Sequence, residues 1–274
     1  MDQQIWLIPM GFVLGTIGTL IGAGGGFILV PVLLLIYPNK SPESITSISL
    51  AVVFLNALSG SAAYARLRRI DYKSGFLLAI ATVPGAVFGA LTTDLIPRRT
   101  FNGIFGVLII VLALYILFHR DKKTEPLDVK KKAHTKISIV EKDGTKHTFS
   151  YDLRLGAALS TLVGYASSLL GIGGGVIHVP ILVRLLNFPV HIATATSHFI
   201  LAIMALAGTI VHIAKGSFTG SSVYETVLLG VGVLFGAQLG AWLSGRIRGD
   251  WIIRALALAL SLVGIRILIM VFKT

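Results

Sequence analysis

The chain has 274 residues, of which 54% are hydrophobic and only 13% are charged, and it contains no cysteine. This composition excludes an ordinary soluble domain and predicts a multi-pass, all-α membrane protein. Without cysteine, neither disulfides nor thiol chemistry can contribute. The net charge of +12 does not indicate nucleic-acid binding, because the basic residues lie between the apolar runs, as the positive-inside rule expects.

The first apolar run covers residues 5–37. As one helix it would be about 50 Å long, too long for a hydrocarbon core of about 30 Å. Five residues in its middle, Gly22-Ala-Gly-Gly-Gly26, resolve the problem, because glycine is a poor helix former. We therefore predict a broken helix with a longer piece (5–21) and a shorter piece (27–37).

Three further spans complete the first transmembrane unit, residues 1–118. They are separated by a basic loop at 66–73 and by short polar turns. The predicted spans are residues 45–65, 74–93 and 101–118.

The only long polar segment is a basic insert, residues 119–154. Alternating residues on both sides of Asp143-Gly144 predict a small β-hairpin. The alternative is a basic linker without regular structure. Three consecutive lysines, 130–132, place this insert on the cytoplasmic side.

The pattern then starts again over residues 155–274, the second transmembrane unit. At a shift of 149 residues the decapeptide Gly22–Pro31 returns as Gly171-Ile-Gly-Gly-Gly-Val-Ile-His-Val-Pro180, with seven of ten positions identical. We predict two internal repeats. The remaining predicted elements are a second glycine-broken run at 155–186 and spans at 192–214, 226–244 and 251–272.

Two topologies are compatible with this pattern. Each broken run either crosses the membrane, which makes the halves parallel, or dips in and returns, which gives three crossings per half and makes the halves inverted. The inverted arrangement places 17 lysines and arginines on the inner side and 5 on the outer side, against 16 and 6 for the parallel one. Inverted repeats with broken helices are a known transporter architecture, so we favour the inverted arrangement.

The acidic residues all lie in loops or at span ends. A cation bound in mid-membrane would need a carboxylate partner there, so the sequence favours an anion. Three consecutive glycines in each break exceed what helix packing needs, whereas backbone N–H groups at a helix start form an anion site. Small polar residues follow each break. The predicted substrate-binding residues are Gly24, Gly25, Gly26, Thr46, Ser47, Asn56, Gly173, Gly174, Gly175, His178, Thr194, Thr196, Ser197 and His198.

Two of these residues are histidines inside predicted spans. A lone histidine in a membrane helix commonly makes an interhelical hydrogen bond, and this alternative stays open for both. His178 takes the place of Leu29 in the first copy of the decapeptide, so the two copies differ there. Contact with the substrate, or proton coupling through His178 or His198, is the functional alternative.

The paired motifs Gly22-Ala-Gly-Gly-Gly…Pro31 and Gly171-Ile-Gly-Gly-Gly…Pro180, with Ala193-Thr-Ala-Thr-Ser197 after the second, resemble those of the TauE/SafE family of membrane transporters, the sulfite exporters. The resemblance covers the chain apart from the insert. It implies an α-helical permease of the plasma membrane that moves sulfite, sulfonates or related small organic anions. The first copy differs from the second after its proline, since it has Ile45-Thr-Ser-Ile-Ser49 where the second has Ile192-Ala-Thr-Ala-Thr196.

Together these features predict a secondary transporter that works by alternating access, with no cofactor, metal site or catalytic residue. The expected partners are a small anion and the lipid bilayer, with a homodimer left open and no nucleic acid. Two alternatives are an intramembrane enzyme, for which only His178 and Ser197 could serve, and an accessory subunit of a larger complex.

Overall fold

The computed structural model describes residues 4–118, 135–142, 144–218, 220–246, 261, 264–265 and 267–269. The whole basic stretch 119–134 and most of the last predicted span, 251–272, therefore lie outside the described residues. The elements are α1 (Leu7–Ile21), α2 (Gly26–Ile36), α3 (Pro42–Arg66), α4 (Tyr72–Thr92), the short turn η2 (Thr93–Leu95), α5 (Arg98–Phe118), β1 (Thr135–Val140), β2 (Lys146–Tyr151), α6 (Leu153–Leu170), α7 (Gly175–Arg184), α8 (Val190–Ala214) and α9 (Gly220–Leu243).

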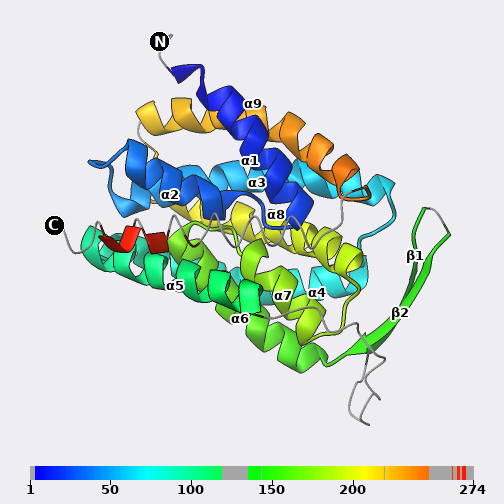
Figure 1. Ribbon diagram of the computed structural model, residues 1–274. Coiled ribbons are helices and arrows are strands. Elements are labelled where there is room, and N and C mark those ends of the chain that lie inside the picture. The colour runs from blue at the N-terminus through cyan, green and yellow to red at the C-terminus, as the bar shows by residue number, and fades with distance from the viewer. Residues whose placement is uncertain are drawn as a thin grey trace.

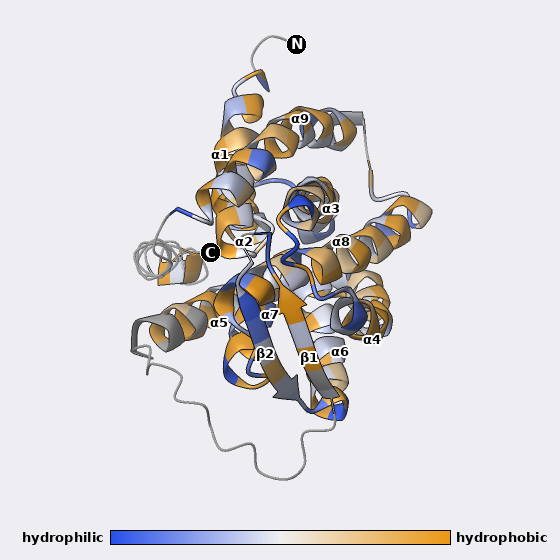
Figure 2. Ribbon diagram, turned by 90° about the vertical axis from the view of Figure 1, so that its right-hand side faces the viewer, coloured by the Kyte–Doolittle hydropathy of each residue, from blue (hydrophilic) through white to orange (hydrophobic). Residues whose placement is uncertain are grey.

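The predicted class, a helical multi-pass membrane protein with one small sheet, is confirmed (Figure 1). Five of the described helices, α3, α4, α6, α8 and α9, are long and apolar enough to cross a membrane. Apolar residues make up much of the helices (Figure 2), and many large apolar side chains are exposed, as contact with lipid requires. The predicted hairpin is also present, with β1 and β2 paired antiparallel.

Both broken helices break where the glycines predict. α1 ends at Ile21 and α2 begins at Gly26, while α6 ends at Leu170 and α7 begins at Gly175. Between them the backbone is left-handed, a conformation that costs glycine little but other residues more. The residues with positive φ are Gly22, Gly24 and Gly25 in the first break and Gly171, Gly173 and Gly174 in the second.

The direction of the first broken helix follows from its neighbours. Gly11 of α1 lies against Leu229 of α9, and Gly240 further along α9 lies against Thr16, so α1 and α9 are parallel. α3 is also parallel to α9, because Lys40 before α3 pairs with Glu225 near the start of α9 and Ser59 bonds to Leu234 further along. Since α1 and α3 run in the same direction, α2 must return between them, and α1–α2 is a hairpin.

The direction of the second broken helix also follows from its neighbours. α6 is parallel to α4, since Gly85 and Gly89 lie against Thr161 and Tyr165. α4 is parallel to α8, because Gly75 near its start lies against Phe199 and Asp94 after its end pairs with Lys215. Hence α6 and α8 run in the same direction, and α7 returns between them.

The two hairpins enter from opposite ends of the bundle, because α3 and α8 are antiparallel. Gly60 of α3 lies against His198, and Leu50 against Gly208. This is the path that the inverted arrangement predicts. The duplication itself and the division into repeats stay predictions.

We call the end where α3 finishes and α8 begins the basic end. It carries the loop 67–71 and the β-hairpin. Glu141 of the hairpin accepts from Arg69 at 2.6 Å and contacts His147 at 2.8 Å, and apolar hairpin residues pack on Phe188. The positive-inside rule predicts that this end is cytoplasmic. We call the other end, where α3 begins and α8 finishes, the far end.

Candidate functional site

The two glycine breaks touch each other in the middle of the bundle. A Cβ atom on Gly175 would lie 2.2 Å from the carbonyl oxygen of Gly22, and one on Gly26 would lie 2.7 Å from that of Gly171. Gly24 and Gly173 both lie against Val53 of α3. The contacts are reciprocal, so each hairpin tip packs against the start of the other hairpin's short helix.

The short helices therefore both begin at this contact, without side-chain caps. The N-cap residues are Gly25 for α2 and Gly174 for α7, and neither helix receives a side-chain cap. Within the described part of the chain, no hydrogen-bond acceptor is found for the amides of Gly26, Phe27 and Val176. Uncapped first-turn amides and the helix dipole both favour a bound anion.

Two serines hold the hairpin tips across the interface between the halves. Ser49 of α3 donates to the carbonyl of Gly171 at 2.6 Å, and Ser197 of α8 donates to that of Gly22 at 3.2 Å. Both serines are fully buried. Ser197 was a predicted site residue. Ser49 was not among the predicted site residues, although its place in α3 corresponds closely to that of Ser197 in α8.

Replacing Ser49 by alanine is expected to lower the free energy of unfolding by about 1–3 kcal/mol, because the buried carbonyl of Gly171 loses its donor. Ser47 offers a matched control in the same helix. It is equally buried, but its hydroxyl donates within its own helix, to the carbonyl of Ser44. Thermal unfolding in detergent should therefore separate Ser49→Ala from Ser47→Ala, and equal shifts would contradict the assigned role.

A polar network lies beside the first break. Thr19 donates to Asn56 Oδ1 at 3.1 Å and contacts His198 Nε2 at 3.2 Å, while Tyr64 donates to the Thr19 carbonyl. Asn56 Nδ2 is buried without a hydrogen-bond partner among the described residues. Asn56 and His198 were predicted. Thr19 and Tyr64 were not predicted. The position of Thr19 shortly before the glycines could have indicated its role, whereas no feature of the sequence indicated Tyr64.

The second break has its own unpartnered hydroxyls. Ser167 and Ser168, at the end of α6, are fully buried, and neither hydroxyl has a hydrogen-bond partner within the part of the chain that the structure describes. A Cβ atom on Gly174 would lie 3.0 Å from Ser167 Oγ, so this hydroxyl lies next to the start of α7. The hydroxyl of Thr46 is likewise buried and unpartnered, and its methyl group packs on Gly171.

Four predicted site residues use their polar groups elsewhere. Ser47 bonds within α3, as described above, and Thr194 donates to Val190 within α8. Thr196 accepts from the amide of Asp71, in the loop before α4. His178 Nε2 lies 3.0 Å from Ser160 Oγ, which links α7 to α6. The interhelical hydrogen bond, left open above, thus describes His178 well.

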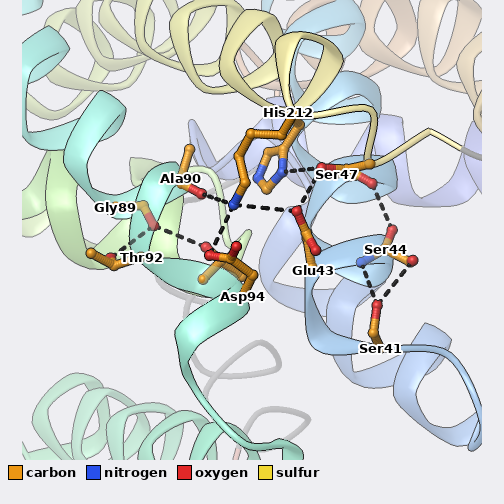
Figure 3. Close-up of polar contacts among 12 residues, drawn as sticks. Ser41, Glu43, Ser44, Ser47, Gly89, Ala90, Thr92, Asp94 and His212 are labelled. Carbon is orange, nitrogen blue, oxygen red and sulfur yellow. Dashed lines mark hydrogen bonds and ion pairs between the residues drawn. The ribbon is translucent and has the colours of Figure 1, made fainter.

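A charged cluster lies at the far end, beyond the last turn of α8 (Figure 3). Lys215 Nζ is 2.9 Å from Asp94 and 3.3 Å from Glu43. Ser217 donates to Glu43 at 2.7 Å and contacts His212 at 3.3 Å. The cluster connects the start of α3 and the end of α4 to the end of α8. It therefore ties the first half of the chain to the second.

Among the described residues, no three histidine, aspartate or glutamate side chains gather as a metal site would need. Membrane-crossing helices combined with two broken helices that meet in the interior define a multi-pass membrane protein of the transporter class.

The chain belongs to the sulfite exporter TauE/SafE family, which it matches over residues 7–267. It is 32% identical over 270 residues to the probable membrane transporter protein YunE of Bacillus subtilis, covering 96% of both chains. A probable membrane transporter protein of Methanocaldococcus jannaschii is 24% identical over 254 residues, covering 88% of this chain and 86% of that protein. No solved structure matches the chain. The predicted family and the transporter class are confirmed.

Proposed function

We propose that this chain transports a small anion, such as sulfite or a sulfonate, and holds it beside the two glycine breaks, at the starts of α2 and α7. The observation that carries the proposal is that α2 and α7 both start at the contact between the breaks, with first-turn amides that have no acceptor among the described residues. Each start supplies about half a positive charge. Both halves would therefore contribute to one anion site.

Side chains around the breaks fit this proposal. Ser167 Oγ and Thr46 Oγ1 are buried without partners, and a hydroxyl can donate to an oxyanion. Aspartate and glutamate are missing from both decapeptides and from the residues of α3 and α8 that contact them. An anion buried there would meet hydrogen-bond donors and no negatively charged side chain. A cation buried there would find no carboxylate to balance its charge.

Alternating access would proceed by motion of one half against the other about this site. In the described structure both breaks are buried, and the cluster of Lys215, Glu43 and Asp94 links the halves at the far end. Opening toward that end would separate the two carboxylates from the lysine. Proton coupling through His178 or His198 is a further part of the proposal, and a transport rate that stays flat from pH 5 to 8 would remove it.

Ser167→Ala is expected to weaken anion binding about tenfold, because a hydrogen bond to a charged group contributes about 1.5–3 kcal/mol. The fold should be unaffected, since this hydroxyl has no protein partner. Isothermal titration of the purified protein with sulfite, sulfoacetate, thiosulfate and sulfate measures the effect. Ser47→Ala is the control, because its hydroxyl bonds within its own helix.

A second pair of variants tests the backbone. Gly174 and Gly216 have nearly the same φ, 70° and 69°, so alanine strains both alike. Only position 174 has side chains within contact distance of the added Cβ. Gly174→Ala should lose anion affinity and Gly216→Ala should keep it. Unchanged affinity in both Gly174→Ala and Ser167→Ala would refute the site.

A further inference from the structure

A groove runs along the outer surface between α3 and α8, on the half of the bundle nearer the basic end. It encloses about 360 Å³. Leu58 and Leu206 are 50% and 40% exposed, so the groove opens outward, toward the lipid. Its walls are mainly apolar side chains, among them Phe54, Leu58 and Ala62 of α3 and Phe199, Ala202 and Leu206 of α8.

The dimensions of the groove suit an extended hydrocarbon chain. The α3 wall runs from Phe54 to Ala65, which corresponds to about 16 Å along the helix. Because α3 and α8 are antiparallel, Phe199 lies near the basic end and Leu206 lies deeper. The groove therefore runs along the direction in which the helices cross the membrane, as an acyl chain does.

The mouth of the groove lies at the basic end, where Ile70 and Tyr72 line it. Tyr72 is 54% exposed and packs edge-on against Phe199, with ring centroids 5.5 Å apart. An exposed tyrosine at the end of a span marks the headgroup level. The groove thus reaches from the headgroup region into the hydrocarbon region.

Three basic residues flank this mouth, namely Arg66, Arg68 and Lys73. All three are exposed, and none has an ion-pair partner among the residues described here. The lysines of the far end differ, since Lys40 and Lys215 are both paired with acids. Asp71, between Ile70 and Tyr72, is buried, so the exposed charge at the mouth is positive.

One polar side chain belongs to the wall of the groove. Ser61 lines it, and its hydroxyl is buried with no hydrogen-bond partner among the residues that the structure describes. Ser61 precedes Arg66 by five residues, about 7.5 Å along the helix. A donor at this depth below a basic cluster matches the ester carbonyls that lie below the phosphate of a phospholipid.

We propose that this groove binds an anionic phospholipid of the leaflet at the basic end. The phosphate contacts Arg66, Arg68 and Lys73, Ser61 donates to an ester carbonyl, and one acyl chain lies between α3 and α8. Because α3 and α8 belong to different halves, the lipid spans the surface along which the halves meet. The proposal does not depend on which solute is carried.

Native mass spectrometry of the purified chain tests this site with equimolar phosphatidylglycerol and phosphatidylcholine. Each basic side chain near an anionic lipid is worth roughly fivefold in affinity. The unaltered chain should therefore retain phosphatidylglycerol over phosphatidylcholine by about tenfold or more. The variant Arg66→Gln/Arg68→Gln/Lys73→Gln should lose that preference.

A matched control removes the same charge elsewhere, at exposed positions away from the groove. Arg99→Gln/Lys146→Gln/Arg154→Gln should keep the preference. Ala62→Phe, which fills the groove from its exposed rim, should lower retention of both lipids. Since none of these measurements involves the transported anion, their failure would leave the anion site untouched.

A photoactivatable phosphatidylglycerol gives an independent measurement on the unaltered chain. Its acyl chain should label peptides that contain residues 54–65 and 199–206. Equal retention of the two lipids, equal losses in the two triple variants, or labelling spread evenly over the helices would each overturn the proposal. So would a dimer that Ala62→Phe dissociates, because a second copy would then occupy the groove.

Discussion

Gly175→Ala is expected to lower the free energy of unfolding by about 3 kcal/mol, the upper end of the usual cost of overpacking. The added methyl group would lie 2.2 Å from the carbonyl oxygen of Gly22 and 2.6 Å from Cα of Ala23. Both atoms belong to backbone, which cannot rotate away as a side chain can. The two hairpin tips would have to separate, so the variant should also lose anion binding.

Gly103→Ala is the matched control, because this glycine is also helical and a Cβ atom there would meet nothing within 4 Å. In an unobstructed helix, alanine is favoured over glycine by about 1 kcal/mol. The two variants should therefore shift thermal unfolding in opposite directions in the same detergent. A Gly175→Ala protein as stable as Gly103→Ala would contradict the contact between the breaks.

Lys215→Met is expected to open the far end. It would leave Glu43 and Asp94 without the cation that joins them across the halves. Each 1.4 kcal/mol lost from the closed state increases the open population tenfold, and we expect about that change from two partly buried ion pairs. The natural chain has no cysteine, so an introduced one is a unique reporter.

Ser47→Cys supplies that reporter. Ser47 is fully buried and lies one turn beyond Glu43, near the charged cluster (Figure 3). In the Lys215→Met background, a membrane-impermeant maleimide should label this cysteine about tenfold faster than in the Ser47→Cys chain alone. Arg99→Met, which removes an exposed charge at the same end, should leave the rate unchanged. Equal rates in all three proteins would show that the cluster does not close this end.

The protonation of Lys215 should not set a pH optimum near neutrality. Partial burial lowers its pKa, but hydrogen bonds and charge from Asp94 and Glu43 outweigh this effect and raise the pKa above the ordinary lysine value. When folding raises the pKa of a lysine, the resulting stabilisation is complete at pH values below the pKa that the lysine has in the unfolded chain. It is lost only as the pH rises through the pKa that the lysine has in the folded chain. The ion pairs thus persist through neutral pH, and a pH-dependent rate there would implicate another group.

Short sequence patterns predicted the helix breaks and the β-hairpin, because both depend on the backbone preferences of a few neighbouring residues. The glycine clusters broke their helices where expected, since few other residues tolerate three left-handed positions in so short a segment. Asp143-Gly144 indicated the hairpin, because this dipeptide suits a tight turn between alternating strands. The paired motifs also sufficed to identify the family.

The residues missed or misplaced depend on contacts between distant segments. Ser49 and Ser47 are both small, polar and buried in the same helix, yet only Ser49 reaches the other half. Thr196 and Ser197 are neighbours, but helical rotation of about 100° per residue directs one to a loop and the other to a break. No local pattern distinguishes such pairs, because the partner lies more than 100 residues away in the sequence.

By itself, then, the sequence determined that this is a multi-pass helical protein with two glycine breaks, since composition and backbone preference act within a few residues. Tertiary structure decided that the breaks touch, that each hairpin returns to the end from which it entered, and which hydroxyls face the breaks. Those features depend on how α3 and α8 pack in opposite directions, bringing together carbonyls, amides and serines that the chain holds far apart.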